Sequence, residues 1–216
     1  TPLALAFSSA GEQARSEYGY TVNRAGDING DGYEDVIAGA WGYDAPGKAD
    51  AGKIWVYHGG PNGLNPVAAY TAEGEMGDAY FGMAVAPAGD VNGDGYGDVV
   101  VGSYRYDVPG KVNAGKVYVF HGGPNGLTGT PATAAFSAVG ENAGDWFSGS
   151  VAGAGDVNGD GYSDIIVAAE SFAAGQAGSY RGKVYVFHGG PNGLTGTAAN
   201  PAYSAVGEVA QARLGG

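Results

Sequence analysis

Several residue types are scarce or absent in this chain of 216 residues. There is no cysteine, which excludes disulfide bridges, zinc–thiolate sites and thiol nucleophiles. Lys and Arg number 10 against 22 Asp and Glu, a formal net charge of −12, so neither a nucleic acid nor an anionic membrane surface is an expected partner. Because no apolar run approaches the roughly 20 residues of a membrane-spanning helix, we expect no membrane insertion.

Large aliphatic side chains are also scarce. Leu, Ile, Val and Phe together number 39, about 18% of the chain, and such a low share with a high net charge is typical of disordered proteins. However, aromatic residues reach 12%, and the 43 glycines recur at fixed places in long repeats. The sequence therefore predicts a folded repeat protein.

A unit of roughly 65 residues occurs three times. An Asp-rich segment (Gly-Asp-Ile/Val-Asn-Gly-Asp-Gly-Tyr) begins at Gly26, Gly89 and Gly155, and His-Gly-Gly-Pro-Asn-Gly-Leu begins at His58, His121 and His188. A Gly-Glu pair recurs at a similar spacing, with its acid at Glu12, Glu75, Glu141 and Glu208. We expect the histidines to end a strand and the Gly-Glu pairs to end an outer strand.

Each unit contains four short runs with the composition of β-strands. In the first unit these runs are 20–22, 36–38, 54–57 and 70–72, rich in β-branched and aromatic residues and separated by glycine. No apolar stripe of helical period is sustained anywhere. Four short strands per unit predict an all-β fold built from the blades of a β-propeller.

Each Asp-rich segment places oxygen-bearing side chains at positions 1, 3, 5 and 9 of a tight loop. Carboxylates ~4 Å apart repel by about 4 kcal/mol per pair at an effective dielectric near 20, and a hard cation removes this penalty. Calcium accepts about six to eight oxygens, and the carbonyl at position 7 supplies one more. We therefore predict three Ca²⁺ per chain, held in loop 1 by Asp27, Asn29, Asp31, the Tyr33 carbonyl and Asp35, in loop 2 by Asp90, Asn92, Asp94, the Tyr96 carbonyl and Asp98, and in loop 3 by Asp156, Asn158, Asp160, the Tyr162 carbonyl and Asp164.

Other interpretations of these loops fit less well. An EF-hand needs a Glu at position 12 and flanking helices, but here position 12 is Ala38, Val101 or Val167 in a β-rich run. RTX repeats have a period of about nine residues, and magnesium demands a stricter octahedron. Asp-Gly and Asn-Gly also make ordinary tight turns. Three copies that keep all four oxygen side chains favour calcium.

The order of these motifs resembles the FG-GAP repeats of the integrin α-subunit β-propeller and its bacterial relatives. The resemblance covers essentially the whole chain and rests on an aromatic-Gly pair, the Asp-rich loop, a Gly-Ala-Pro-like strand end and a Gly-x-Val-Tyr-Val strand. Tyr18-Gly19 and Phe81-Gly82 match the first motif, whereas Phe147-Ser148 replaces its glycine. None of the three strand ends keeps the proline.

The resemblance implies four-stranded antiparallel blades, with Ca²⁺ in the loop between the innermost and second strands. Blades 1, 2 and 3 would span residues 18–77, 78–143 and 144–210, with an outermost strand of a preceding blade in 1–17, centred on 5–9, and the start of a further blade in 211–216. Propellers have about four to eight blades, so three cannot close a ring. We expect a homo-oligomer, two copies giving six blades; the alternative is that the chain is a fragment of a longer propeller.

Aromatic residues gather in the loops between the second and third strands. In related propellers these loops lie on the face opposite the calcium loops, where ligands bind. We expect a protein or carbohydrate ligand to contact Trp41, Tyr43, Tyr104, Tyr106 and Phe172, with Tyr80 and Trp146 near the same face. The alternative is that these rings only cover blade edges.

The sequence shows no Ser-His-Asp set, no paired carboxylates outside the metal loops and no nucleotide fingerprint. It therefore predicts a noncatalytic calcium-binding module for recognition or adhesion, secreted or at the cell surface, where calcium is plentiful. One alternative is a hydrolase or lyase with its active site on the loop face or in the central channel. Another is a self-assembling scaffold, natural or designed, that binds no ligand.

Overall fold

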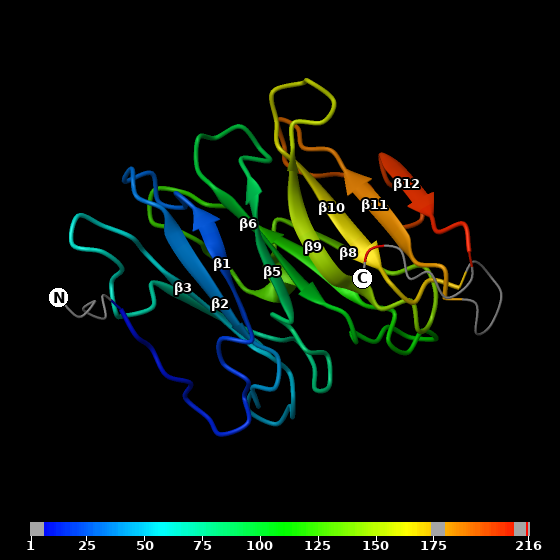
Figure 1. Ribbon diagram of the computed structural model, residues 1–216, viewed down its shortest axis with the longest axis horizontal. Coiled ribbons are helices and arrows are strands. Elements are labelled where there is room, and N and C mark those ends of the chain that lie inside the picture. Colours follow the sequence, from blue (N-terminus) through cyan, green and yellow to red (C-terminus); the bar gives the residue numbers. More distant parts are fainter. Residues whose placement is uncertain (1–6, 174–179, 210–214, 216) are drawn as a thin grey trace.

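The computed structural model describes residues 7–173, 180–209 and 215, which form three four-stranded antiparallel sheets lying side by side (Figure 1). Within each sheet the strands follow one another in chain order, so that each sheet is a simple meander. One short 3₁₀ helix, Pro131–Thr133, precedes the last strand of the second sheet. The predicted fold class, three four-stranded blades of an all-β propeller, is confirmed.

The strands agree with the predicted runs, with small shifts at their ends. Blade 1 contains β1 (Thr21–Gly26), β2 (Asp35–Ala40), β3 (Lys53–Tyr57) and β4 (Tyr70–Glu73). Blade 2 contains β5 (Ala84–Gly89), β6 (Asp98–Ser103), β7 (Lys116–Phe120) and β8 (Phe136–Val139). Blade 3 contains β9 (Phe147–Gly155), β10 (Asp164–Ala169), β11 (Lys183–Phe187) and β12 (Tyr203–Val206). Among the described residues no helix is long and apolar enough to cross a membrane.

The hydrophobic core lies between the blades. Ile54 and Val56 of blade 1 pack with Phe81, Val99 and Tyr118 of blade 2. An equivalent cluster joins Val117 and Val119 of blade 2 to Ile165, Tyr185 and Phe187 of blade 3. All six residues of β6 are buried because blade 2 has a neighbour on both faces. Full burial of one such side chain stabilises by about 1.5–3 kcal/mol, so each blade depends on the next one for much of its stability.

Glycine allows the inner parts of neighbouring blades to approach at backbone distance. A Cβ added at Gly39 would strike the carbonyl oxygen of Gly82, and one at Gly102 would strike that of Ser148. These positions cannot carry a side chain without separating the blades. The small content of large aliphatic residues is therefore compensated in part by close packing of the backbone.

Ser148, which replaces the glycine of the aromatic-Gly pair in blade 3, keeps the left-handed backbone of that glycine. Its φ is +71°, against +82° for Gly82. The Ser148 hydroxyl donates to the Lys116 carbonyl at 2.7 Å and accepts from the Ser103 amide at 3.0 Å. Two hydrogen bonds to blade 2 thus offset the cost of this backbone conformation, which is about 1–3 kcal/mol for a residue other than glycine.

The N-terminal segment differs from the expectation. The predicted outermost strand at 5–9 is not a strand in its described part, Phe7–Ser9, and residues 5 and 6 lie outside the described residues. An outermost strand pairs with the third strand of its own blade, and no described segment supplies that partner. Phe7 instead packs edge-on against Tyr57 at 5.3 Å, and Ser9 shares a 3.0 Å hydrogen bond with the same tyrosine.

Of the predicted start of a further blade, 211–216, only Gly215 is described. A Cβ added there would contact Ala168 and Val184 of blade 3. In the same way, a Cβ added at Gly82 would contact Gly39 and Ile54, which are the equivalent residues of blade 1. Gly215 therefore lies over blade 3 as the glycine of an aromatic-Gly pair lies over the blade before it.

Candidate metal loops and ligand face

The three Asp-rich loops join the first and second strands of their blades and share one geometry. In loop 2 the Asp90 carboxylate accepts hydrogen bonds from the amides of Gly93 at 2.7 Å, Asp94 at 3.1 Å and Gly95 at 2.8 Å. Asp94 accepts from the Tyr96 amide at 3.0 Å. The same bonds recur in loops 1 and 3. Hydrogen bonds from the loop amides thus orient the carboxylates.

The last aspartate of each loop begins the second strand and is fully buried. Asp98 accepts from the amides of Val91 at 2.8 Å and Gly122 at 2.9 Å, and so ties the loop to the end of β7. Burial raises the pKa of Asp98 to about 7, more than these two hydrogen bonds lower it. Burial raises the pKa of Asp35 in loop 1 as well. A carboxylate held at this depth is a strong ligand for a cation, because a positive charge replaces its lost hydration.

The structure brings each predicted donor set together within one loop of nine residues, from Asp27 to Asp35, Asp90 to Asp98 and Asp156 to Asp164. Among the described residues no three Asp, Glu or His side chains converge as a ready metal site. The carboxylate oxygens are instead turned to loop amides. Each set nevertheless consists only of oxygen, with three carboxylates, one amide and one carbonyl, and this is the chemistry that calcium prefers.

Loops 1 and 2 are each covered by the blade that follows. The Gly97 amide of blade 2 donates to the Asp27 carbonyl at 2.8 Å, and the Gly123 amide donates to the Ile28 carbonyl at 2.9 Å. The ring of Tyr96 lies so close to Gly30 that an added Cβ would come within 2.7 Å of it. Blade 3 covers loop 2 in the same way, through Ser163, Gly190 and Tyr162.

The histidines lie against these loops, a role that the sequence did not reveal. The Asn29 amide donates to His58 Nδ1 at 3.3 Å, and Asn92 donates to His121 Nδ1 at 3.2 Å. The other ring nitrogen of both histidines is buried without a partner. Each ring also touches a turn glycine of the next blade, Gly126 or Gly193. The histidine therefore links the asparagine of its own loop to the neighbouring blade.

Loop 3 has none of these contacts from a described residue. The Val157 side chain is 57% exposed, whereas its equivalents Ile28 and Val91 are fully buried. A Cβ added at Gly159 would meet nothing within 4 Å. The three loops are nearly identical in sequence, so this difference comes only from the absence of a covering blade among the described residues.

The Gly-Glu pairs connect successive blades. Glu75, which follows β4 of blade 1, accepts hydrogen bonds from Lys116 and Tyr118 of blade 2, each at 2.7 Å. Glu141 bonds Lys183 and Tyr185 of blade 3 in the same way. Burial works to raise the pKa of the Glu75 carboxyl, but the hydrogen bonds from Lys116 and Tyr118 outweigh it and hold the pKa below its usual value. We call each such Glu, Lys and aromatic trio a clamp.

Glu12 forms the clamp of blade 1, with Lys53 at 2.9 Å and the Trp55 indole at 3.0 Å. Glu208 follows β12 at the equivalent place in blade 3 and is exposed, and it has no hydrogen-bond or ion-pair partner among the described residues. The sequence carried a usable signal for the clamp, since Lys-x-Trp/Tyr opens every third strand 41 or 42 residues after the acid of a Gly-Glu pair.

Three of the five predicted ligand residues, Tyr43, Tyr106 and Phe172, pack against the lysines of the clamps instead. The Lys53 ammonium lies 4.6 Å from the ring centre of Tyr43 and 4.9 Å from that of Trp55. Tyr106 and Phe172 cover Lys116 and Lys183 in the same way, at 4.8 and 5.0 Å. Tyr43 and Phe172 are buried, so the prediction that they are exposed to a ligand is wrong. Tyr106 is partly exposed but packs at 6.5 Å against Tyr118.

The other two predicted ligand residues lie in a continuous line of rings, which we call the aromatic row. It runs across all three blades through Tyr20, Trp41, Tyr80, Tyr104 and Trp146, with successive ring centres 6.2, 4.8, 5.7 and 5.7 Å apart. Each second strand leads away from its Asp-rich loop, so the row lies on the opposite face. Arg105 lies over the Tyr80 ring at 4.8 Å and donates to its hydroxyl at 2.8 Å.

Two members of the aromatic row have an unfavourable backbone. Tyr80 and Trp146 have φ values of +59° and +53°, in the left-handed region that bulky residues rarely adopt. Both precede an aromatic residue that is fully buried, Phe81 or Phe147. The turn thus sends one ring into the core and the preceding ring to the loop face. Backbone strain of this kind costs about 1–3 kcal/mol and gathers at functional sites.

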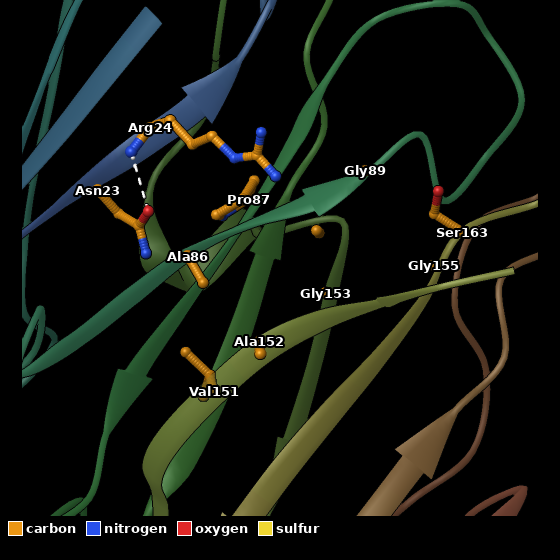
Figure 2. A pocket seen from close by; sticks show the side chains of 11 residues that line it. Asn23, Arg24, Ala86, Pro87, Gly89, Val151, Ala152, Gly153, Gly155 and Ser163 are labelled. Carbon is orange, nitrogen blue, oxygen red and sulfur yellow. Dashed lines mark hydrogen bonds between the residues drawn. The ribbon is translucent and has the colours of Figure 1, made fainter. Parts of the chain in front are cut away.

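The innermost strands surround a hollow of about 440 Å³ where the central channel of a ring would lie (Figure 2). β1, β5 and β9 supply its walls, mostly with small residues such as Ala86 and Gly153. Arg24 is its one charged residue, and the Arg24 amide donates to the Asn23 side chain at 2.9 Å. The described lining holds no nucleophile with an adjacent base.

Comparison with known proteins agrees with this architecture. Residues 19–57, 81–120 and 148–187 each match the FG-GAP repeat. The chain belongs to the FG-GAP repeat family. This FG-GAP protein is 37% identical over 135 residues to integrin alpha-PS2 of Drosophila melanogaster, a match of 60% of this chain and 9% of that relative. It is 36% identical over 169 residues to integrin alpha-6 of Gallus gallus, 76% of this chain and 14% of that relative.

A relative of another kind is phosphatidylinositol-glycan-specific phospholipase D of Homo sapiens, 33% identical over 201 residues, 89% of this chain and 22% of that relative. The FG-GAP chain thus spans between 9% and 22% of the length of these three curated relatives. The matched FG-GAP segments contain the Asp-rich loops and the first three strands of every blade.

Proposed function

We propose that this FG-GAP protein is a noncatalytic calcium-binding propeller module for extracellular recognition or adhesion, secreted or at the cell surface. The observation that carries the proposal is the aromatic row, which presents five neighbouring rings on the loop face. Rigid aromatic side chains give a protein ligand or a sugar ring a large contact area at low entropic cost. Similarity to integrin α-subunits supports an adhesion role.

Calcium is the structural cofactor in this proposal, one ion in each loop. Its charge would offset the repulsion among the three carboxylates and the burial of the last one, Asp35, Asp98 or Asp164. The residues of this chain supply five oxygen ligands per loop, and the loop amides already hold the carboxylates in place. The ion would therefore stabilise the loop and the blade contacts around it.

A titration of the metal-free protein with calcium tests this part. Calorimetry should show three bound ions per chain, and EDTA should lower the melting temperature. Each loop should contribute about 2.7 kcal/mol of stability when free calcium is 100-fold above its Kd. Heat signals no larger than dilution, together with a melting temperature indifferent to EDTA, would contradict a calcium-binding function.

Ligand binding is tested on glycan and protein arrays with matched variants. Trp41→Ala and Tyr104→Ala remove rings from the aromatic row and should abolish a binding signal. Val67→Ala shortens a side chain that is 71% exposed in the loop between β3 and β4, away from the row, and should leave the signal unchanged. Equal binding by all three variants would show that the row is not the recognition surface, and binding to nothing at all would favour a scaffold.

An enzyme is the second candidate, favoured by the similarity to a phospholipase D. The match covers 22% of that relative, and the described residues of this chain offer no catalytic set in the central hollow. Turnover of a phosphodiester, ester or polysaccharide panel by the purified chain would support the enzyme and contradict the noncatalytic proposal.

Self-assembly completes the proposed function. Three blades leave the first face of blade 1 and the last face of blade 3 without a neighbouring sheet among the described residues (Figure 1). Two copies joined end to end would have six blades, within the range of about four to eight in which propellers close. In a closed ring every blade 1 and every blade 3 has a neighbouring blade, whereas an open chain of copies leaves one of each uncovered at its ends.

A further inference from the structure

The uncovered face of blade 3 carries unused partners for a blade of the same repeat. Each of loops 1 and 2 gives two carbonyls to the next blade, those of Asp27 and Ile28 or of Asp90 and Val91. In blade 3 the equivalent carbonyls belong to Asp156 and Val157, and no described amide binds them. Ile166, Val184 and Val186 are only half-buried, whereas the equivalent Val100, Val117 and Val119 of blade 2 are fully buried.

Blade 1 carries the complementary groups, and they are also unused. The amides of Glu34 and Gly60 stand where Gly97 and Gly123 donate to loop 1, and they have no described acceptor. Tyr33 is 42% exposed, although its equivalents Tyr96 and Tyr162 pack on a loop glycine. A Cβ added at Gly63 would meet nothing, although Gly126 and Gly193 each touch a histidine of the preceding blade.

The innermost strand of blade 1 shows the same asymmetry. The side chain of Val22 on β1 is 65% exposed, whereas its equivalent on β5, Val85, is 6% exposed because it packs against blade 1. A neighbour placed before blade 1 would bury Val22 as blade 1 buries Val85. The apolar residues left half-covered on blade 3 are the same kind of surface that blade 1 offers to blade 2.

We propose that the uncovered face of blade 3 binds blade 1 of a second copy of this chain. Amides of Glu34 and Gly60 in the incoming copy would donate to the carbonyls of Asp156 and Val157. The Tyr33 ring would cover Gly159, and Gly63 would pack on His188. This inference rests on the self-assembly in the proposed function and assigns its surface. The proposal rests on a group-by-group match between two faces that no described sheet covers, and the match repeats an interface that the chain already makes twice.

Two local segments compete with the incoming copy. Gly215 covers Ala168 and Val184, the place that Gly19 of the incoming copy would take. Glu12 holds Lys53 and Trp55, the clamp that Glu208 of the other copy would otherwise form. Docking therefore requires Gly215 to move aside. It also makes Glu208 of one copy compete with Glu12 of the other copy for the Lys53 ammonium. The Glu12→Gln variant, which weakens the local competitor, should bind the second copy more tightly.

The test is the molar mass in solution, measured by light scattering in saturating calcium. The wild-type chain should give twice the 21.5 kDa of one copy. Val22→Lys places a charge on the docking face at a site that is exposed in a single copy, so it should give a folded monomer. Val112→Lys alters the charge equally at a side chain that is 63% exposed in blade 2, away from both faces, and should remain a dimer.

A wild-type monomer at high concentration, or a Val22→Lys variant that stays dimeric, would overturn the proposed interface. Glu12→Gln gives a second measurement, because its dimer should dissociate at lower concentration than the wild type. Calcium titration of the same samples separates the two proposals. A monomer that binds three ions contradicts the docking alone, and a dimer that binds none contradicts the calcium function alone.

Discussion

Loop 2 and loop 3 have almost the same sequence but different surroundings. Val91 of loop 2 is fully buried under blade 3, and Asn92 is held by a histidine that touches the same blade. Val157 of loop 3 is 57% exposed, and among the described residues Asn158 has hydrogen-bond partners within its own loop alone. The comparison shows that the loop motif sets the hydrogen bonds within the loop, including those of the candidate metal ligands, whereas the next blade provides the packing around them. Blade contacts and metal affinity should therefore be coupled.

Removal of the buried aspartate should destabilise loop 2 far more than loop 3. Asp98→Ala leaves the amides of Val91 and Gly122 buried without an acceptor, at a cost of about 3 kcal/mol. Asp164→Ala strips the amides of Val157 and Gly189, but water can reach them beside the exposed Val157, so the cost should be near 1 kcal/mol. Urea unfolding in EDTA at low protein concentration measures both.

The EDTA removes any metal contribution, and the dilution keeps the chain monomeric. Asp98→Asn is the control, since it retains one oxygen acceptor and should recover part of the loss. Equal losses for the two alanine variants would mean that the covering blade does not protect loop 2.

A smaller effect is expected at the clamps. Glu75→Gln removes the charge that binds Lys116 and Tyr118, and should lower the free energy of unfolding by about 2 kcal/mol. Glu208→Gln alters an exposed side chain without a described partner and should change it by less than about 0.5 kcal/mol in the monomer. Chemical unfolding of the two variants under the same conditions gives both free energies of unfolding, and similar losses would show that the clamp does not stabilise the contact between blades 1 and 2.

The same clamp predicts a dependence on acid. Because the pKa of Glu75 is lower in the folded chain, its contribution is fully present above the unfolded pKa of about 4.3 and is lost as the pH falls through the folded pKa. The difference in stability between wild type and Glu75→Gln should therefore be constant above about pH 5 and shrink below pH 4. A difference that stays constant down to pH 3 would contradict the lowered pKa.

The smallest expected effect concerns the histidines. His121→Ala frees the Asn92 amide and should weaken calcium binding to loop 2 about tenfold, as the loss of a residue that orients a ligand usually does. His188→Ala should leave loop 3 unchanged, because no described bond joins His188 to Asn158. Calorimetric titration gives both affinities. His121→Gln, which retains an acceptor, should restore most of the affinity if orientation is the cause.

Much of the fold followed from the sequence because its signals are local. The β-branched and aromatic runs predicted all twelve strands within a few residues, and the aromatic-Gly pairs marked the innermost strands. The Asp-rich loops were equally legible as turns, since all their members lie within nine residues and adopt one repeated geometry. That their oxygens bind calcium stays a prediction. Only the strand at 5–9 failed in its described part, because a strand needs a partner that local sequence cannot supply.

The candidate ligand residues were predicted less well, because side-chain exposure depends on neighbours far away in the chain. Tyr43 and Tyr104 both stand in loops between second and third strands, and composition alone does not distinguish them. Tyr43 turns inward over Lys53, whereas Tyr104 packs between Tyr80 and Trp146 on the loop face. The backbone conformation of Tyr80 and Trp146, which sends these rings outward, has no signature in a single residue type.

Chemistry within a few residues accounts for everything that repeats along the chain: four strands, one acidic loop and one Gly-Glu pair in every unit. What each repeat touches depends instead on how the blades pack. Packing between blades makes Glu75 part of a clamp and leaves Glu208 without a partner among the described residues, and it buries Val91 but exposes Val157. The physical reason is that burial and hydrogen bonding between blades depend on the neighbour present at each face, and identical units at the middle and edge of an array have different neighbours.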